Sequence, residues 1–195
     1  MKRLFDITIS LLIILFFSPF GLIFSILILV SSKGGVFYKQ KRVGRFGKPF
    51  MLLKFRTMKA GSDKLGQLTI GMRDSRITKI GYFLRKFKLD EFPQFINVLK
   101  GEMSIVGPRP EVQEYVDLYT PEQLKILNVK PGITDYASLE YFDENRLLGE
   151  STNPKETYIK QIMPHKLKLN AKYLTNPSLT EDFKIIFQTA KKIFS

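Results

Sequence analysis

An uninterrupted apolar stretch near the N-terminus is the strongest pattern in the chain. From Ile7 to Val30, 24 positions carry no charged side chain. A helix rises about 1.5 Å per residue, so this stretch would extend about 36 Å, enough to cross a hydrocarbon core about 30 Å thick. The pattern therefore predicts a membrane helix. A signal peptide fits poorly, because its apolar core usually has about 7–15 residues and no small-residue cleavage pattern follows here.

Ser18 and Pro19 lie in the middle of this stretch. A proline cannot donate to the Leu15 carbonyl and its ring clashes with the preceding turn, so a helix should bend at this point. The Ser18 hydroxyl can satisfy a carbonyl about one turn earlier. We therefore expect the membrane helix to be broken at Ser18-Pro19.

Positive charge flanks both ends of the apolar stretch. Lys2 and Arg3 precede it, and no acidic residue occurs between Asp6 and Asp63. The basic residues that follow are Lys33, Lys39, Lys41, Arg42, Arg45, Lys48, Lys54, Arg56 and Lys59. Such flanks stay on the cytoplasmic side of a membrane. Two positive flanks favour a re-entrant helix over residues 1–32, which enters one leaflet and returns; a straight span, oriented by the larger downstream charge, is the alternative.

The rest of the chain has the pattern of short helices around one hairpin. Two apolar runs on either side of a glycine-bearing turn at 44–49 predict a β-hairpin over 36–58, with basic side chains facing headgroups or a phosphate ligand. Residues 60–75 are polar and should form a loop. Helical spacing of apolar residues predicts helices over 78–88 and 92–99, a rigid turn follows at 107–110, and Thr120-Pro121 marks another helix start.

The C-terminal segment has the features of an amphipathic helix. Ser178 and Glu181 have the spacing of a capping box, and apolar residues recur from Phe183 to Ile193. Such a helix can lie on the membrane surface or pack against the core, and the pattern leaves both open. The predicted fold is mostly α with a small β-hairpin: a single globular domain over 33–195, attached by the re-entrant helix and carrying surface amphipathic helices.

Composition narrows the chemistry. The 195 residues include 31 Lys and Arg against 18 Asp and Glu, one His and no Cys. Disulfides, thiolate metal sites, a Cys nucleophile and a His-rich metal cluster are therefore excluded. The formal charge of +13 favours a polyanionic partner, which could be nucleic acid, anionic lipid or a phosphate-rich substrate.

Asp90 and Glu91 are an adjacent acid pair among basic residues at a predicted helix start. A structural role would explain them, because Asp is a favoured N-cap and Glu is favoured in the first turn. The functional interpretation gains from Arg85 and from Arg109, which two prolines flank. A carboxylate that attacks phosphorus approaches an anionic group, so cations must be fixed there in advance. Arginine offers forked donors for phosphate, and one or two carboxylates plus phosphates can hold Mg²⁺.

Simpler explanations exist for two other residues. Arg109 could be a turn residue that pairs with Glu111 or Glu102, and His165 is expected on the surface or in packing rather than as a base. The sequence contains neither GxxxxGK[ST] nor GxGxxG, so a P-loop kinase and a Rossmann enzyme are not expected.

Three segments carry a resemblance to a known family. They are Lys54-Phe55-Arg56-Thr57-Met58, the block from Leu89 to Pro110, and Val129-Lys130-Pro131-Gly132-Ile133-Thr134. In this order, and with Ser18-Pro19 in the hydrophobic segment, the chain resembles the bacterial sugar transferases, the monotopic phosphoglycosyl transferases. The resemblance is to the minimal catalytic form of that family, which lacks the additional N-terminal spans and domain of larger members.

The resemblance implies transfer of a sugar 1-phosphate from a UDP-sugar to undecaprenyl or another polyprenyl phosphate, with release of UMP, as the initiating step of bacterial surface glycan synthesis. It implies that Asp90 is a nucleophile forming a covalent phosphosugar intermediate, that Glu91 assists it, and that Mg²⁺ is required, held by Asp90 with or without Glu91. Arg85, Arg109 and Lys54 would contact the phosphates. Residues 33–195 would be a cytoplasmic catalytic domain on the inner membrane.

The chain departs from many relatives after Thr134, where Asp135-Tyr136-Ala137-Ser138 replaces Gly-Trp-Ala-Gln or similar. This region is a candidate determinant of sugar identity. Two other functions remain open: a membrane-tethered basic protein that binds nucleic acid or anionic lipid without catalysis, and a transferase that moves only the sugar and releases UDP. Basic residues without interleaved base-stacking motifs argue against nucleic acid. A homodimer and a monomer are equally open.

Overall fold

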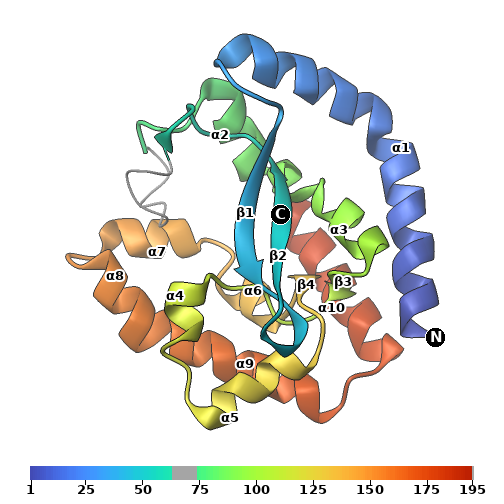
Figure 1. The fold of residues 1–195 in the computed structure, drawn as a ribbon, viewed down its shortest axis with the longest axis vertical. Helices are drawn as coiled ribbons and strands as arrows, with labels where there is room; N and C mark the ends of the chain where they lie inside the picture. The colour runs from blue at the N-terminus through green and yellow to red at the C-terminus, as the bar shows by residue number, and fades with distance from the viewer. Residues whose placement is uncertain (63–73, 195) are drawn as a thin grey trace.

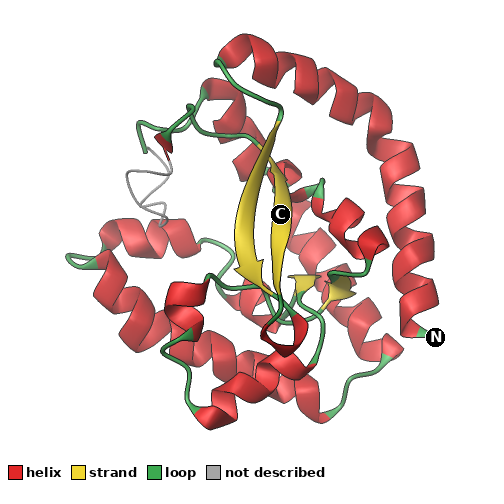
Figure 2. Cartoon of the chain, viewed as in Figure 1, coloured by secondary structure: helices red, strands yellow, loops and turns green. Residues whose placement is uncertain are grey.

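The structure is a computed structural model that describes residues 1–62 and 74–194. Helices surround one long β-hairpin, as the predicted fold class requires (Figures 1 and 2). The elements are α1 (Lys2–Ser31), β1 (Phe37–Val43), β2 (Pro49–Phe55), α2 (Lys79–Lys86), α3 (Gln94–Lys100), β3 (Ser104–Val106), α4 (Gln113–Val116), α5 (Pro121–Leu124), β4 (Gly132–Thr134), α6 (Tyr136–Glu140), α7 (Glu144–Glu150), α8 (Pro154–Thr157), α9 (Met163–Thr175) and α10 (Leu179–Phe194). Most of the loop expected over 60–75 lies outside the described residues.

α1 is one continuous helix that contains Pro19 and curves along the edge of the domain (Figure 1). The Ser18 hydroxyl donates to the Leu15 carbonyl at 2.9 Å, as expected for a hydroxyl beside a proline-opened turn. The structure therefore shows a bend rather than a break between two helices, because the backbone remains helical on both sides of the proline. The division into residues 1–32 and 33–195 stays a prediction.

One face of α1 contacts the domain and the other is exposed and apolar. Phe17 lies 5.7 Å from Phe92 between ring centroids, Phe24 packs on Phe55, and Ile28 is fully buried. The outward face includes Leu11, Leu12, Leu15, Phe16, Ile23, Ile26 and Val30. An exposed apolar surface of this extent is typical of a membrane contact. The hydrophobicity and length of α1 are sufficient to cross a bilayer.

Buried polar contacts attach the N-terminal end of α1 to the domain. The Arg3 guanidinium donates to the carbonyls of Val98 and Leu99 at the C-terminal end of α3, where a cation is favoured. The Asp6 carboxylate is 2% exposed and accepts from the Ser104 hydroxyl at 2.9 Å and from the Ile105 amide at 3.1 Å. The opposite end is attached too, because Arg56 donates to the Ser32 carbonyl at 2.7 Å.

The hairpin agrees with its prediction. β1 and β2 pair antiparallel, with Phe37 opposite Phe55 and Val43 opposite Pro49. Leu52 and Phe50 of β2 are buried in the central core with Val98, Met103 and Ile185. The buried side chains of β2 fix this strand against α3, so Lys54 near its end is held at a defined position.

The structure contains a second pair of strands, β3 and β4, which are parallel and which the sequence analysis did not predict. Ser104 of β3 pairs with Gly132 of β4, and Val106 pairs with Thr134. The strands approach closely because glycines occupy the contact: a Cβ on Gly132 would lie 2.1 Å from the amide nitrogen of Gly107. Three-residue strands give little periodicity, so the pattern of apolar residues could not reveal them. This contact fixes the start of the turn that carries Arg109.

Gly132→Ala should lower the free energy of unfolding by about 3 kcal/mol or more, because the added methyl collides with backbone atoms that cannot rotate away. Urea unfolding in detergent measures the change. Gly35→Ala is the matched control, since a Cβ there meets nothing within 4 Å, and it should change stability by less than about 0.5 kcal/mol. Equal stability of the two variants would contradict the close approach.

The C-terminal helix α10 begins at the predicted residue, and it has one buried face and one exposed face. The Glu181 amide donates to the Ser178 hydroxyl at 3.2 Å. Ile185 is fully buried, whereas Phe183 and Phe187 are 54% and 72% exposed. α10 therefore packs on the core along one face and presents aromatic rings outward along another, next to Phe5 of α1.

Candidate active site

Asp90 and Glu91 belong to a short 3₁₀ turn, Leu89–Glu91, that precedes α3. The helix starts at Gln94 with Pro93 at its N-cap and no side-chain cap, so the capping explanation of the acid pair is wrong for α3. Lys88, directly before the turn, has a left-handed backbone with φ 56°. Non-glycine residues adopt this conformation rarely; they occur in turns, as at Phe46, and they also cluster at active sites.

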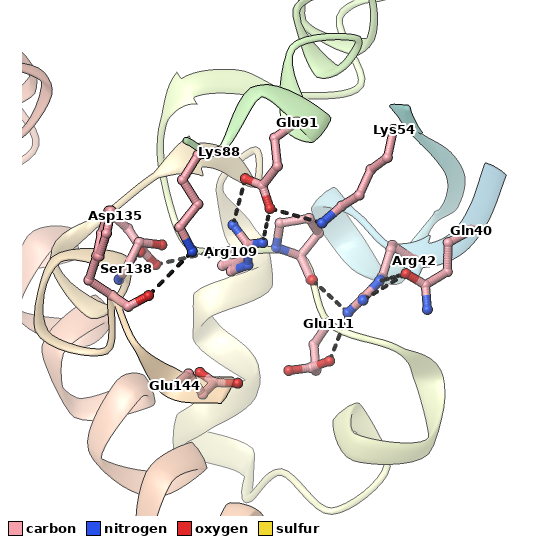
Figure 3. Close-up of polar contacts among 12 residues, drawn as sticks. Gln40, Arg42, Lys54, Lys88, Glu91, Arg109, Glu111, Asp135, Ser138 and Glu144 are labelled. Carbon is pink, nitrogen blue, oxygen red and sulfur yellow. Dashed lines mark hydrogen bonds and ion pairs between the residues drawn. The ribbon is translucent and has the colours of Figure 1, made fainter. Parts of the chain in front are cut away.

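Glu91 is the centre of an ion-pair network (Figure 3). Its Oε1 accepts from Lys54 Nζ at 2.8 Å and from Arg109 Nη2, and its Oε2 accepts from Arg109 Nη1 at 3.2 Å. The glutamate side chain is 12% exposed. The simpler explanation of Arg109, an ion pair with Glu111 or Glu102, is wrong as to the partner: Glu111 pairs with Arg42, and Glu102 accepts from Asn97.

The pKa values of the two carboxylates are shifted in opposite directions. Burial raises the pKa of Asp90 above its ordinary value, and the nearby Glu91 charge raises it further against the opposing effects of Lys54 and Arg85. Burial would also raise the pKa of Glu91, but Arg109 and Lys54 hold it well below the usual range. Among the described residues, no side chain forms a hydrogen bond or ion pair with the Asp90 carboxylate, although Asp90 is only 7% exposed. Adjacent acids with opposite pKa shifts are typical of catalytic pairs.

The predicted phosphate ligands surround this pair. Lys54, Arg85 and Arg109 line the same cavity as Asp90 and Glu91, a space of about 590 Å³. Arg85 reaches it from α2, where its Nε donates to the Thr57 hydroxyl at 2.8 Å. Burial lowers the pKa of Lys54, opposed by the Glu91 charge. Residues far apart in the sequence thus place cations around one buried carboxylate.

Asp135 fixes Arg109 in place, and the sequence reasoning missed this role. The Asp135 carboxylate is 1% exposed and accepts from the Arg109 backbone amide at 3.0 Å. It also caps α6 by accepting from the Ser138 amide at 2.6 Å. The Asp-x-x-Ser spacing after Thr134 was the available indication, because Asp is a strong N-cap. Asp135 therefore connects the arginine turn to α6.

The cavity is lined by further charged groups to which the sequence analysis assigned no individual role. Lys88 Nζ donates to the Phe142 carbonyl at 3.3 Å, and Lys166 pairs with Glu144 at 2.8 Å. Arg42 connects Gln40 to Glu111 (Figure 3). His165 bonds Tyr141 through Nδ1 at 2.7 Å at an exposed position, in agreement with its expected surface role.

The described residues contain no group of three His, Asp or Glu side chains that could hold a metal ion. A dedicated metal cage of protein ligands is thus absent from the part of the chain that the structure describes. Four carboxylates line the cavity: Glu111 pairs with Arg42 and Glu144 with Lys166, whereas Asp90 and Glu91 lie beside Lys54, Arg85 and Arg109. This donor set fits a hard cation that takes most of its ligands from phosphates and water.

The whole chain matches one protein family. The sequence model of the family described as "Bacterial sugar transferase" aligns with residues 1–195. The sugar transferase EpsL of Bacillus subtilis, itself uncharacterized, is 38% identical over 193 residues, which cover 99% of this chain and 87% of that protein.

Relatives with named substrates are longer. The UDP-glucose:undecaprenyl-phosphate glucose-1-phosphate transferase of Klebsiella pneumoniae is 39% identical over 199 residues, and that of Escherichia coli is 37% identical over 198. The alignments cover 99% and 100% of this chain. They cover 40% of each relative, so the chain spans about two fifths of these proteins.

Proposed function

The chain belongs to the bacterial sugar transferase family, and from this premise we propose that it moves a sugar 1-phosphate from a UDP-sugar to undecaprenyl phosphate and releases UMP. One observation carries the proposal: Asp90, a buried carboxylate that accepts from no side chain in residues 1–62 and 74–194, lies in a cavity lined by Lys54, Arg85 and Arg109. The named activities of the Klebsiella and Escherichia coli relatives involve the same two substrates.

In the first half-reaction, an Asp90 carboxylate oxygen attacks the β-phosphorus of the UDP-sugar. A bond forms between this oxygen and phosphorus, and the bond from the β-phosphorus to the bridging oxygen breaks. UMP leaves with the electron pair. Arg109 and Lys54 lower the repulsion between the anionic reactants, because fixed cations are already in place before charge develops.

In the second half-reaction, a phosphate oxygen of the lipid acceptor attacks the same phosphorus. The bond between phosphorus and Asp90 breaks, so the carboxylate is regenerated and the diphosphate-linked lipid sugar is released. Glu91 keeps its charge throughout, because its pKa lies well below the usual range. It orients Arg109 and Lys54 rather than exchanging a proton.

Asp90, with Glu91 beside it, would hold Mg²⁺ through carboxylate oxygen, and substrate phosphates would complete its coordination. The ion would supply compact positive charge against the phosphates. The Glu91 oxygens already accept from Arg109 and Lys54, whereas those of Asp90 accept from no described residue. Asp90 is therefore the better placed of the two ligands.

We further propose that α1 is re-entrant and that the domain lies on the cytoplasmic face of the inner membrane. Both ends of α1 are attached to the same domain, through Arg3 at one end and the Ser32 carbonyl at the other. A straight span would place its ends on opposite sides of the bilayer, which one domain cannot occupy. Instead, the exposed apolar face of α1 would enter one leaflet.

The decisive experiment supplies a panel of UDP-sugars, undecaprenyl phosphate in nanodiscs and Mg²⁺, and identifies the nucleotide product. UMP, together with a lipid-linked sugar diphosphate, is the expected result. UDP would indicate transfer of the sugar alone. Absence of both nucleotides, with salt-sensitive binding of nucleic acid, would replace the proposal by a non-catalytic binding role.

The rate of the first half-reaction should fall on the acid side at a pH above the ordinary Asp value of about 3.9. Burial raises the pKa of Asp90, so the proton persists to a higher pH and the attacking carboxylate is lost as the pH falls through that raised value. The measurement is the initial rate of UMP release between pH 4.5 and 8. A rate that does not change over this range, for a protein that circular dichroism shows to stay folded, would contradict a raised pKa of Asp90.

A further inference from the structure

The cavity beside Asp90 has two chemically different ends. Its polar end carries the cations and carboxylates of the candidate active site. Its other end is lined by apolar side chains from separate parts of the chain, among them Ile9, Ile13, Phe17, Phe95, Ile186 and Ile193. One continuous cavity thus connects a cationic site to a carbon-lined space.

The apolar end lies between α1 and α10. Ile9, Ile13 and Phe17 follow one another at four-residue intervals, which places them along one side of α1. Ile186, Ala190 and Ile193 have the corresponding helical spacing on α10. The hydroxyls in this wall are already used, because Thr134 and Thr189 bond to each other at 2.7 Å and Thr189 also donates to the Ile185 carbonyl.

The same helix that forms one wall exposes apolar residues on its other side. Leu15 and Phe16 are 74% and 70% exposed, directly before Phe17, which lines the cavity. Residues adjacent in a helix point in different directions, so α1 separates the cavity from its outward apolar face. Under the proposed membrane arrangement, that outward face contacts lipid, and the apolar end of the cavity lies at the bilayer boundary.

We propose that the space between α1 and α10 binds the isoprene units nearest the phosphate of the lipid acceptor and directs that phosphate to the cations beside Asp90. The inference rests on the proposed function. An amphiphile with one anionic head complements a cavity that is cationic at one end and apolar at the other, whereas a UDP-sugar is polar throughout. A volume of about 590 Å³ is that of a small-molecule site, so the distal chain remains in the bilayer.

Ala190→Trp tests whether the space between α1 and α10 binds the acceptor. Ala190 lines this space and is exposed, so a larger side chain fills the space without disturbing the core. Gln188→Trp is the matched control: it lies on the same helix, is exposed and is not among the residues that line the cavity. Two steps are measured separately. Release of UMP without acceptor reports the first half-reaction, and transfer to undecaprenyl phosphate gives the acceptor KM.

Ala190→Trp should raise the acceptor KM at least tenfold relative to Gln188→Trp while still releasing a burst of UMP. Equal acceptor KM values for the two variants would overturn the proposal that the acceptor binds between α1 and α10. A wild-type protein that releases no UMP at all would instead refute the proposed function, so the two failures are distinguishable.

Photolabelling gives a second readout that does not depend on turnover. A prenyl phosphate with a diazirine on an isoprene unit close to the phosphate is irradiated with the wild-type protein in nanodiscs, and labelled peptides are identified by mass spectrometry. Labels at Ile9, Ile13 or Phe17 and within residues 186–193 are expected, and competition by undecaprenyl phosphate should remove them. Labels confined to the outward side of α1, at Leu11, Leu15 or Phe16, would overturn the proposal.

Discussion

Asp90→Asn is expected to lower turnover by at least about 10³-fold, because an amide cannot form the bond to phosphorus that both half-reactions of the proposed mechanism require. The same change should leave the protein at least as stable as the wild type. Burial raises the pKa of Asp90, which means that the folded state disfavours its charge at neutral pH. Release of UMP and thermal unfolding in detergent measure the two effects. Near-normal UMP release would remove Asp90 from the nucleophile role.

Glu91→Gln is the matched control, since it removes one negative charge from the neighbouring residue. It should retain measurable activity, because Glu91 orients cations and does not bond to the substrate. Its effect on stability has the opposite sign: loss of the charge leaves Arg109 and Lys54 without their partner, at a cost of about 3 kcal/mol. Equal activities of the two variants would contradict the assignment of roles.

Arg109→Ala is expected to lower kcat/KM by about 10²- to 10³-fold, because it removes a forked donor from the position where phosphate charge must be balanced. Arg109 donates to both oxygens of Glu91, and its backbone amide is fixed by Asp135, so the guanidinium is positioned before substrate arrives. Single-turnover release of UMP measures the effect on the first half-reaction separately from acceptor binding.

Arg109→Lys separates charge from geometry. Lysine keeps the positive charge but cannot reproduce the planar fork, so it should recover only part of the loss, to about tenfold below the wild type. Full recovery by lysine would show that charge alone is required. No difference between Arg109→Ala and the wild type would exclude Arg109 from phosphate binding.

Local patterns in the sequence predicted much of the fold. The hairpin, the helix after Thr78 and the capped start of α10 each depend on a few neighbouring residues, and the structure confirms all three. The acid pair was also found locally, from its basic surroundings. The sequence analysis placed Lys54 and Arg109 at the same site but did not predict that they pair with Glu91, because they are 37 and 18 residues away from it and only the tertiary fold brings them together.

The β3–β4 pair could not be predicted from the sequence for a different reason. Its strands are three residues long, and they are held by a close approach of Gly107 to Gly132 rather than by a run of apolar residues. Single glycines are common in turns, so the sequence did not indicate that Gly107 and Gly132 contact each other. The role of Asp135 was hidden for the same reason, because its contact with the Arg109 amide requires the two segments to lie side by side.

The contacts of Arg3 and Asp6 have a practical consequence for purification of this protein. Deleting α1 to obtain a water-soluble fragment would expose the apolar surface of the domain that α1 covers, and it would also remove polar contacts. It would strip the Ser104 hydroxyl and the Ile105 amide of their acceptor, and would deprive Asp182 of Lys2. α1 is part of the folding unit, so purification must preserve it, in nanodiscs or a gentle detergent, if the candidate active site is to stay folded.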